Sequence, residues 1–474
     1  MQSSRVVFFA AVFAAGIGSV VHCAPDVTTS SGVTENRSPA LVIQDDSQVH
    51  TALERARSAF LKGKPFNRCD VAVMIQDTPG SPWRRAEING VNLTYPASCV
   101  KLAYLAAAMH WSRENNVPPN TLDKAVRPMI EKSDNVQTGV VVDAITSAPN
   151  IADIQTTSDG RYASWFAARH YTMRYLEREG LLYDQVLLHK TYPTNSGNDL
   201  IGAEKFARAD GGMNQMQPLA TAELIARIAT GNLEPQATQY MRDVLKHDRW
   251  GFSSATGPGF PPGTTYLNKA GWAYSNANDI AYAELPTGQR VVLSVFTNAF
   301  IQPYRSDPSP HEKTILGEFA ELLLLELGMI PGADQGYFDT SGTSVKVKGD
   351  WKKIEMAGCA PSGAPGSGMS ALSKSAGDGS ARIEWNLSVP KVGRYEVCVA
   401  YPQSPDRTPA ATYTVHHADG TSTVSVNQRK VGGRWNRLGD YRFEAGKGSV
   451  ELSDAGATST TVAAGALRAL RWPD

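Results

Sequence analysis

Pro96-Ala-Ser-Cys-Val-Lys101 is the stretch around which this chain is organised. Apolar residues follow it at steps of three and four, which predicts a buried helix from about Ser98 to Asn115. Residues i and i+3 of a helix share a face, so the Lys101 amine is expected beside the Ser98 hydroxyl. A buried lysine with a lowered pKa can take the proton of a serine nucleophile. By itself the pattern is more often a capping serine followed by a solvated lysine.

Two later stretches carry groups suited to the same chemistry. Ser133-Asp-Asn135 follows a helix predicted over 122–132, and its hydroxyl and amide can pass a proton and hold a carbonyl. Taken alone, the triplet is more typical of an N-cap for the helix predicted over 136–145. Lys269-Ala-Gly271 lies in a strand predicted over 265–274, where a lysine can bind a carboxylate and a glycine admits close approach. The alternative is that Lys269 is an edge-strand lysine whose only role is to discourage aggregation.

The order S-x-x-K, S-D-N, K-x-G is the signature of class A β-lactamases and penicillin-binding proteins. Residues from about 47 to 329 resemble such a serine hydrolase, and Asn214-Gln-Met-Gln-Pro218 and the run from Asp279 to Gly288 agree. The resemblance implies an α+β fold. An antiparallel sheet carries the first and last helices on one face and a mostly helical lobe on the other.

The resemblance also implies the role of each site residue. Ser98 would be the acylated nucleophile, Lys101 its base and Ser133 the proton donor to the leaving nitrogen. Asn135 would hold the substrate amide. Lys269 would bind the substrate carboxylate beside Ala270 and Gly271, and the N–H groups of Ser98 and Trp272 would form the oxyanion hole. No cofactor and no metal are implied, and the chain contains no CxxC, HExxH or phosphate-binding loop.

Three features depart from the class A pattern. Ala270 stands where a hydroxyl is usual, which removes a partner of the substrate carboxylate. Ser133 follows Ser98 by only thirty-five residues, so the helical lobe must be trimmed there, while a longer stretch, 148–209, follows. Glu204 is the one nearby candidate for the deacylating base, but its surroundings match poorly and also suit a solvated loop carboxylate. Without a positioned base, the acyl-enzyme would persist.

Beyond the hydrolase the residue pattern changes to period two, with many short strands, which predicts an all-β sandwich over 345–474. The runs Tyr413–Gly420, Gly432–Trp435 and Phe443–Gly446 resemble the golvesin and xanthan-lyase carbohydrate-binding-like domain. This resemblance implies polysaccharide binding only in general terms. The aromatics Trp385, Tyr395 and Trp435 are expected to be core rather than a sugar platform.

The expected organisation is a signal peptide over 1–23, a flexible leader over 24–45, the hydrolase over 46–332, a linker over 333–344 and then the sandwich. A signal peptide predicts export to a periplasm or the exterior. In an exported chain the four remaining cysteines suggest the disulfides Cys69–Cys99 and Cys359–Cys398, with four free thiols as the alternative.

The sequence therefore predicts an exported serine hydrolase that opens a β-lactam or related amide through an acyl-Ser98 intermediate. A D-alanyl-D-alanine peptidase or an esterase acting on cell-wall fragments is the alternative. A non-catalytic protein that binds cell wall or polysaccharide is a third hypothesis. The chain has 46 basic and 46 acidic residues, which argues against a nucleic-acid partner held by bulk charge. No membrane partner is expected after cleavage of the signal.

Overall fold

The computed structural model describes residues 40–62, 66–187, 201–251, 254–273, 276–299, 310–330, 335–338, 344–355, 370–430, 432 and 435–471. The predicted signal peptide and Cys359 lie outside these ranges. No helix in the described part of the chain is long and apolar enough to cross a membrane.

A six-stranded sheet forms the centre of the hydrolase part of the chain, in the order β1-β3-β2-β6-β5-β4 among the described strands. All neighbours are antiparallel except β1 and β3, which run parallel. The strands are β1 (Ile43–Asp45), β2 (Phe66–Gln76), β3 (Trp83–Ile88), β4 (Thr265–Ala273), β5 (Asn276–Glu284) and β6 (Arg290–Ala299). Strand β4, which carries Lys269, is therefore an edge strand, as the sequence predicted.

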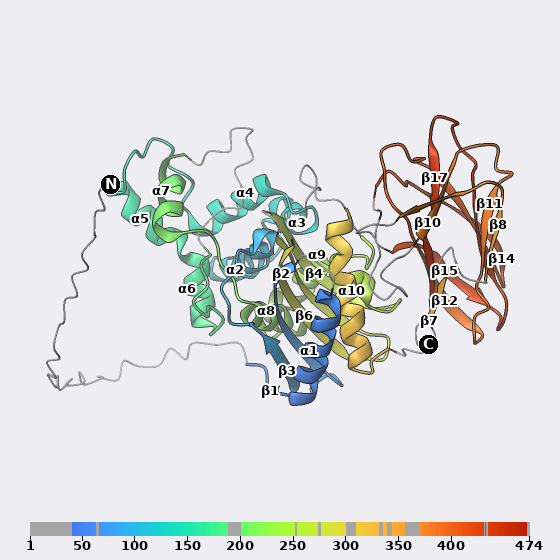
Figure 1. Ribbon diagram of the computed structural model, residues 1–474. Helices are drawn as coiled ribbons and strands as arrows, with labels where there is room; N and C mark the ends of the chain where they lie inside the picture. Colours follow the sequence, from blue (N-terminus) through green and yellow to red (C-terminus); the bar gives the residue numbers. More distant parts are fainter. Residues whose placement is uncertain are drawn as a thin grey trace, which may run out of the picture. The chain divides into compact units, whose positions relative to one another are not determined.

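The two faces of this sheet bury different helices because side chains alternate along each strand. Val71, Val73 and Ile75 pack in the cluster that contains α1 (Ser47–Leu61) and α10 (Pro310–Glu326). Ala72 and Met74 point the other way, into the cluster of the helical lobe. Figure 1 shows α1 and α10 together on one face of the sheet. The expected placement of the first and last helices is confirmed.

The lobe on the other face is built around α2 (Lys101–Glu114), which is buried almost all round. It packs against α3 (Asp123–Glu131), α4 (Asn135–Thr146), α6 (Tyr171–Arg178) and α8 (Pro218–Thr230), and α9 (Thr238–Leu245) packs against α3 and α8. The long stretch after α4 supplies α6 together with α5 (Gly160–Arg169) and α7 (Gly202–Gly211). Helices α5 and α7 share a small aromatic cluster of their own around Tyr162 and Trp165.

The C-terminal part is all β, as predicted. Its described strands form sheets in the orders β14-β13-β16-β11-β8, β15-β12-β18-β7 and β17-β10-β9. The strands are β7 (Gln335–Phe338), β8 (Val345–Lys348), β9 (Lys352–Glu355), β10 (Ser370–Ser375), β11 (Arg382–Asn386), β12 (Gly393–Ala400), β13 (Ala411–His417), β14 (Gly420–Val426), β15 (Asn436–Phe443), β16 (Ser449–Ser453), β17 (Thr461–Ala464) and β18 (Ala466–Arg471). Trp385, Tyr395 and Trp435 are buried, so the expectation that they are core residues is confirmed.

Two segments that were predicted to be a flexible leader and a linker contain short strands, which corrects both predictions. The end of the leader predicted over 24–45 forms β1, whose backbone pairs with Trp83, Arg84 and Arg85. Within the linker predicted over 333–344, β7 pairs with β18. Both are edge strands of only three or four residues, so they carry too little apolar alternation to be recognised from sequence.

The disulfide predictions are wrong for the described cysteines. Cys69, Cys99 and Cys398 are buried free thiols. Cys69 packs in the cluster of α1 and α10, whereas Cys99 packs in the cluster of the helical lobe, so the sheet separates them. Cys398 packs beside Ala400 and Trp435. Burial raises the pKa of Cys69 and Cys398 to about 12, which keeps both as inert thiols.

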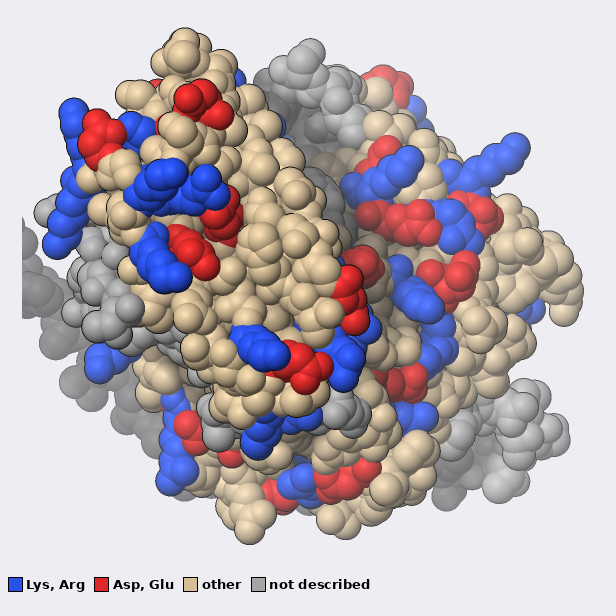
Figure 2. Space-filling model, turned by 90° about the vertical axis from the view of Figure 1, so that its right-hand side faces the viewer, with Lys and Arg blue, Asp and Glu red and all other residues tan. Residues whose placement is uncertain are grey.

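The surface carries mixed charge. Figure 2 shows lysine and arginine side chains interspersed with aspartate and glutamate on the face it presents, without a broad field of one sign. This pattern agrees with the zero formal net charge of the chain. Attraction of a charged ligand to this face must therefore come from local arrangements of side chains.

Candidate active site

Ser98 lies in a short 3-10 turn, η1 (Ala97–Val100), which leads directly into α2. Ala97, just before it, has a φ of 49°, a conformation that non-glycine residues rarely adopt. Such strain is retained where the surrounding structure holds it, often at functional sites. The first residue of α2 is Lys101, which is fully buried, and its Nζ lies 3.1 Å from Ser98 Oγ. The Lys101 amine therefore lies beside the Ser98 hydroxyl, as the sequence predicted.

The Ser133-Asp-Asn135 triplet closes around the same amine. Lys101 Nζ lies 2.6 Å from Ser133 O, 3.2 Å from Ser133 Oγ and 2.8 Å from Asn135 Oδ1. Asp134 has the capping role considered above, since its side chain accepts from the Gln137 N–H at the start of α4. The cap therefore accounts for Asp134, while its two neighbours face the site. Ser133 has a φ of 56°, a left-handed conformation of the backbone. The side chains of Ser133 and Asn135 contact Lys101, while that of Asp134 caps α4.

Lys269 reaches the site from β4. Its Nζ lies 3.1 Å from Ser133 Oγ and donates to Ala270 O at 2.9 Å. Ser133 Oγ therefore stands between the two lysines, within hydrogen-bond distance of both. A hydroxyl in that position can pass a proton from one side to the other.

Burial sets the protonation of the two amines. Burial, followed by the nearby Lys269 ammonium, lowers the pKa of Lys101 to about 6. Burial also lowers the pKa of Lys269 to about 8, against the opposing influence of Asp279. At pH 7 Lys101 is therefore mainly a neutral amine, able to accept a proton, while Lys269 is mainly a cation.

Gly271 and Trp272 follow Lys269 where β4 meets the Ser98 turn. A Cβ on Gly271 would lie 2.4 Å from Pro96 O and 2.8 Å from Ser98 N, so only glycine fits this approach. The Cys99 thiol donates to Lys269 O at 3.2 Å and links the same two elements. These contacts place the residue after Gly271 beside the turn that bears the Ser98 N–H, which suits the predicted oxyanion pair.

Ala270 and Glu204 are engaged elsewhere. Ala270 is only 1% exposed and packs with Tyr266 and Ala281 in the cluster of α1 and α10, on the face opposite the helical lobe. Glu204, on α7, accepts from Arg169 Nη2 at 2.9 Å, and the same nitrogen lies 3.1 Å from Asp143 Oδ1. The predicted deacylating base is therefore held in an ion pair of the α5–α7 region.

Sequence reasoning did not identify Asp279 of β5 as a support for β4. Its carboxylate accepts from Thr256 Oγ1 at 2.7 Å, Tyr266 Oη at 2.8 Å and Asn268 Nδ2 at 2.8 Å. Tyr266 and Asn268 belong to β4, so this buried carboxylate braces the strand that carries Lys269. Asp279 belongs to the run from Asp279 to Gly288 that supports the family resemblance. No local pattern in the sequence reveals that its partners come from two separate segments, Thr256 and strand β4.

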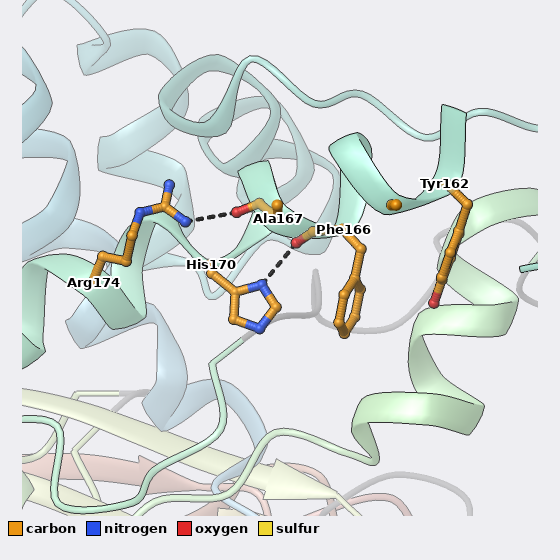
Figure 3. A pocket seen from close by; sticks show the side chains of 6 residues that line it. Tyr162, Phe166, Ala167, His170 and Arg174 are labelled. Atoms are coloured by element: carbon orange, nitrogen blue, oxygen red, sulfur yellow. Dashed lines mark hydrogen bonds between the residues drawn. The ribbon is translucent and has the colours of Figure 1, made fainter. Parts of the chain in front are cut away.

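A separate cavity of about 540 Å³ lies on α5 and α6, lined by Tyr162, Ala163, Phe166, Ala167, His170 and Arg174. In Figure 3 the rings of Tyr162, Phe166 and His170 project from one side of the helices. None of the predicted site residues lines it. In the described residues, no group of three or more His, Cys, Asp or Glu could hold a metal ion.

This arrangement of a helix-start serine, two buried lysines and a bridging hydroxyl accompanies matches to two families. Residues 117–324 match the beta-lactamase enzyme family, and residues 338–471 match the golvesin C-terminal domain. The first match includes Ser133, Asn135 and Lys269 and begins after Ser98. The chain thus combines a β-lactamase-like domain with a golvesin C-terminal domain.

Among characterised proteins, the chain is similar to golvesin of Dictyostelium discoideum, with 29% identity over 461 residues, 94% of this chain and 76% of golvesin. It is also similar to xanthan lyase of Bacillus sp. (strain GL1), 38% identical over 73 residues, which is 15% of this chain and 8% of the lyase. Solved structures similar to it include PBP-A, at 15% identity and a TM-score of 0.40, covering 61% of this chain and 99% of PBP-A. A β-lactamase from Sphaerobacter thermophilus is similar at 17% identity and a TM-score of 0.40, with coverage of 59% and 98%.

Proposed function

We propose that the β-lactamase-like domain is an active serine hydrolase that forms an acyl-enzyme on Ser98. The observation that carries this proposal is the Lys101 amine, fully buried and 3.1 Å from Ser98 Oγ, with neutral oxygens as its described hydrogen-bond partners. A buried amine without a carboxylate partner is costly to stability, and it is useful as a base.

The geometry supports a balanced sequence of proton transfers. Ser98 Oγ gives its proton to Lys101 Nζ and bonds to the substrate carbonyl carbon. The resulting oxyanion is stabilised by the N–H groups of Ser98 and Trp272. Ser133 then gives its proton to the leaving nitrogen as the carbon–nitrogen bond breaks, and it regains a proton from Lys101, which holds the one taken from Ser98. The Lys269 cation remains to attract a substrate carboxylate.

We propose a cyclic or peptide amide as the substrate, with a β-lactam as the first choice. The alternative is a D-alanyl-D-alanine peptidase or an esterase acting on cell-wall fragments. The ion pair between Glu204 and Arg169 favours slow deacylation, because a carboxylate engaged by a guanidinium is a poorer activator of water. Slow deacylation of a β-lactam is the behaviour expected of the peptidase alternative.

The test is the intact mass of the full-length protein after mixing with a chromogenic cephalosporin, with Ser98→Ala as the control. Colour without a lasting adduct would establish turnover, whereas a stable adduct that requires Ser98 would support the peptidase alternative. If neither colour nor adduct appears, a fluorophosphonate probe and ester substrates test Ser98 directly. If Ser98 reacts with none of the cephalosporin, the fluorophosphonate probe and the ester substrates, the hydrolase proposal is overturned and the non-catalytic binding protein is favoured.

We further propose that the chain is exported, on the strength of the apolar segment with Arg5 before it in residues 1–23. The disulfide argument does not support export, since three cysteines are buried thiols. N-terminal sequencing of the secreted fraction tests this directly. A mature protein that begins near Ala24 is the expected result, and retention of Met1 would contradict it.

A further inference from the structure

Strand β14 ends the five-stranded sheet of the C-terminal domain with one side of its backbone unpaired among the described residues. Its other side pairs with β13, from Ala411 opposite Val426 to His417 opposite Gly420. In the described part of the chain, no further backbone group bonds to β14. In an antiparallel pair, every second residue turns its N–H and C=O groups away from the neighbouring strand. Strand β14 therefore presents a row of backbone donors and acceptors that fits another extended strand.

The other edges of the domain's described sheets are protected in ways that β14 is not. The edge strand β8 carries Lys346 and Lys348, and the edge strand β9 carries Lys352 and Lys353. Strand β15 has charged side chains and a break in its register with β12. Residues 406–408 cover β17 by backbone hydrogen bonds, and β7 has only four residues. Lysines, irregular pairing, covering segments and short strands are the usual means by which proteins prevent the addition of a strand.

The residues of β14 themselves favour the addition of a strand. Its sequence, Gly-Thr-Ser-Thr-Val-Ser-Val, contains no charged residue and no proline, and Thr and Val are both β-branched. Thr421, Thr423 and Ser425 are exposed on the outer face of the sheet. Val424 and Val426 lie on the inner face and are only partly buried against the sandwich core. The core is therefore open at this edge, and a further strand would cover the two valines.

We propose that two copies of this chain pair through β14 and form a dimer with one continuous antiparallel sheet. A second copy is the occupant that this strand fits, because β14 is complementary to itself. When two β14 strands run antiparallel about Thr423, each Thr421 lies opposite the partner's Ser425. On the inner face, each Ser422 lies opposite the partner's Val424. The pairing occupies the open edge of each copy, so assembly ends at the dimer. This inference is independent of acylation at Ser98.

The test is sedimentation equilibrium of the full-length protein over a wide range of concentration. A single strand pair is a small interface, so we expect a dimer that dissociates to monomer on dilution. Thr423→Lys places two ammonium groups opposite each other at the axis and should weaken dimerisation by about tenfold or more. Thr414→Lys is the matched control, because Thr414 pairs with Thr423 but lies on β13, one strand away from the edge. The control should leave the equilibrium unchanged.

A pair of substitutions tests the register of the two strands. Thr421→Lys and Ser425→Asp in one chain bring opposite charges together twice across the axis. The dimer of this variant should be several-fold tighter than that of wild type at low salt, and the gain should disappear as NaCl is raised. A gain that is absent at low salt would overturn the register about Thr423.

Amide hydrogen exchange of the wild-type protein needs no substitution and remains informative if Thr423→Lys does not fold. The amides of β14 should exchange slowly at high concentration and rapidly on dilution. A protein that is monomeric at every concentration, or a dimer that folded Thr423→Lys leaves intact, would overturn the proposal. If the protein stays monomeric and a synthetic peptide of Gly420–Val426 protects β14, the edge receives a foreign strand and the dimer is likewise overturned.

Discussion

Helix α2 carries a cluster of ionisable side chains at each end, and the two clusters differ in whether a buried group has a partner of opposite charge. At its start, Lys101 is surrounded by neutral oxygens and its pKa falls to about 6. Near its end, His110 and Arg113 both contact Glu234, at 2.9 and 2.8 Å. Hydrogen bonds from His110 and Arg113 outweigh burial and lower the pKa of Glu234 to about 2. Groups that are paired hold the helix in place, and the group left unpaired is available for chemistry.

The largest expected effect is on acylation at the unpaired end. Lys101→Met keeps the length of the side chain and removes the base, so acylation of Ser98 should slow by roughly 10³- to 10⁴-fold. The temperature of unfolding should stay the same or rise, because a buried amine is replaced by an apolar group. Stopped-flow acylation and calorimetric unfolding of the same sample measure the two quantities. A large loss of stability would contradict the contrast between the two ends of α2.

The opposite result is expected at the paired end. Glu234→Gln should lower the free energy of unfolding by about 3 kcal/mol, the low end for a broken buried pair, because Arg113 is 43% exposed and can turn to water. The acylation rate should change little. Denaturant unfolding at pH 7 measures the loss, with Gln236→Ala as a control that removes only a neutral neighbour of Glu234.

The same variant has a pH signature. The pKa of Glu234 is lower in the folded state than in the unfolded chain, so its contribution to stability is present above about pH 4.5. That contribution disappears as the pH falls toward 2. Glu234→Gln should therefore lose less stability than wild type between those pH values. Parallel curves for the two proteins would show that the ion pair does not stabilise α2.

This contrast also explains what could be predicted from sequence. Ser98 and Lys101 were predictable because a spacing of three residues spans one helical turn, here the 3-10 turn that leads into α2, and so makes the two side chains neighbours. Ser133 and Lys269 required the resemblance to a family, since no local pattern shows that two distant segments meet. The resemblance also predicted that the first and last helices, α1 and α10, cover the same face of the sheet.

Where prediction failed, the deciding partner lay far away in the sequence. Cys69 and Cys99 are on opposite sides of the sheet, which the sequence around neither cysteine reveals. Arg169, the partner of Glu204, is thirty-five residues away in the sequence and lies at the end of α5, within the long stretch that follows α4.

A smaller effect tests the two lysines of the site against each other. Lys101 must be neutral to accept a proton, so acylation should rise as the pH passes about 6. Lys269 must stay charged to hold a carboxylate, so acylation should fall above about pH 8. Each limb should approach tenfold per pH unit. With Lys269→Arg, which stays charged, the alkaline limb should move upward while the acidic limb stays in place. An unmoved alkaline limb would assign it to another group.

The smallest effect concerns Ala270, and it tests whether the missing hydroxyl matters. The alanine methyl packs with Tyr266 and Ala281 away from the lobe, so Ala270→Ser should place a hydroxyl in an apolar cluster. We expect a loss of about 1 kcal/mol in the free energy of unfolding and little gain in affinity for a carboxylate substrate. Ala281→Ser, on the neighbouring strand in the same cluster, is the matched control and should cost a similar amount. A tenfold gain in affinity with Ala270→Ser alone would show that the hydroxyl reaches the substrate. In that case β4 would present residue 270 to the site, and the carboxylate would not depend on Lys269 alone.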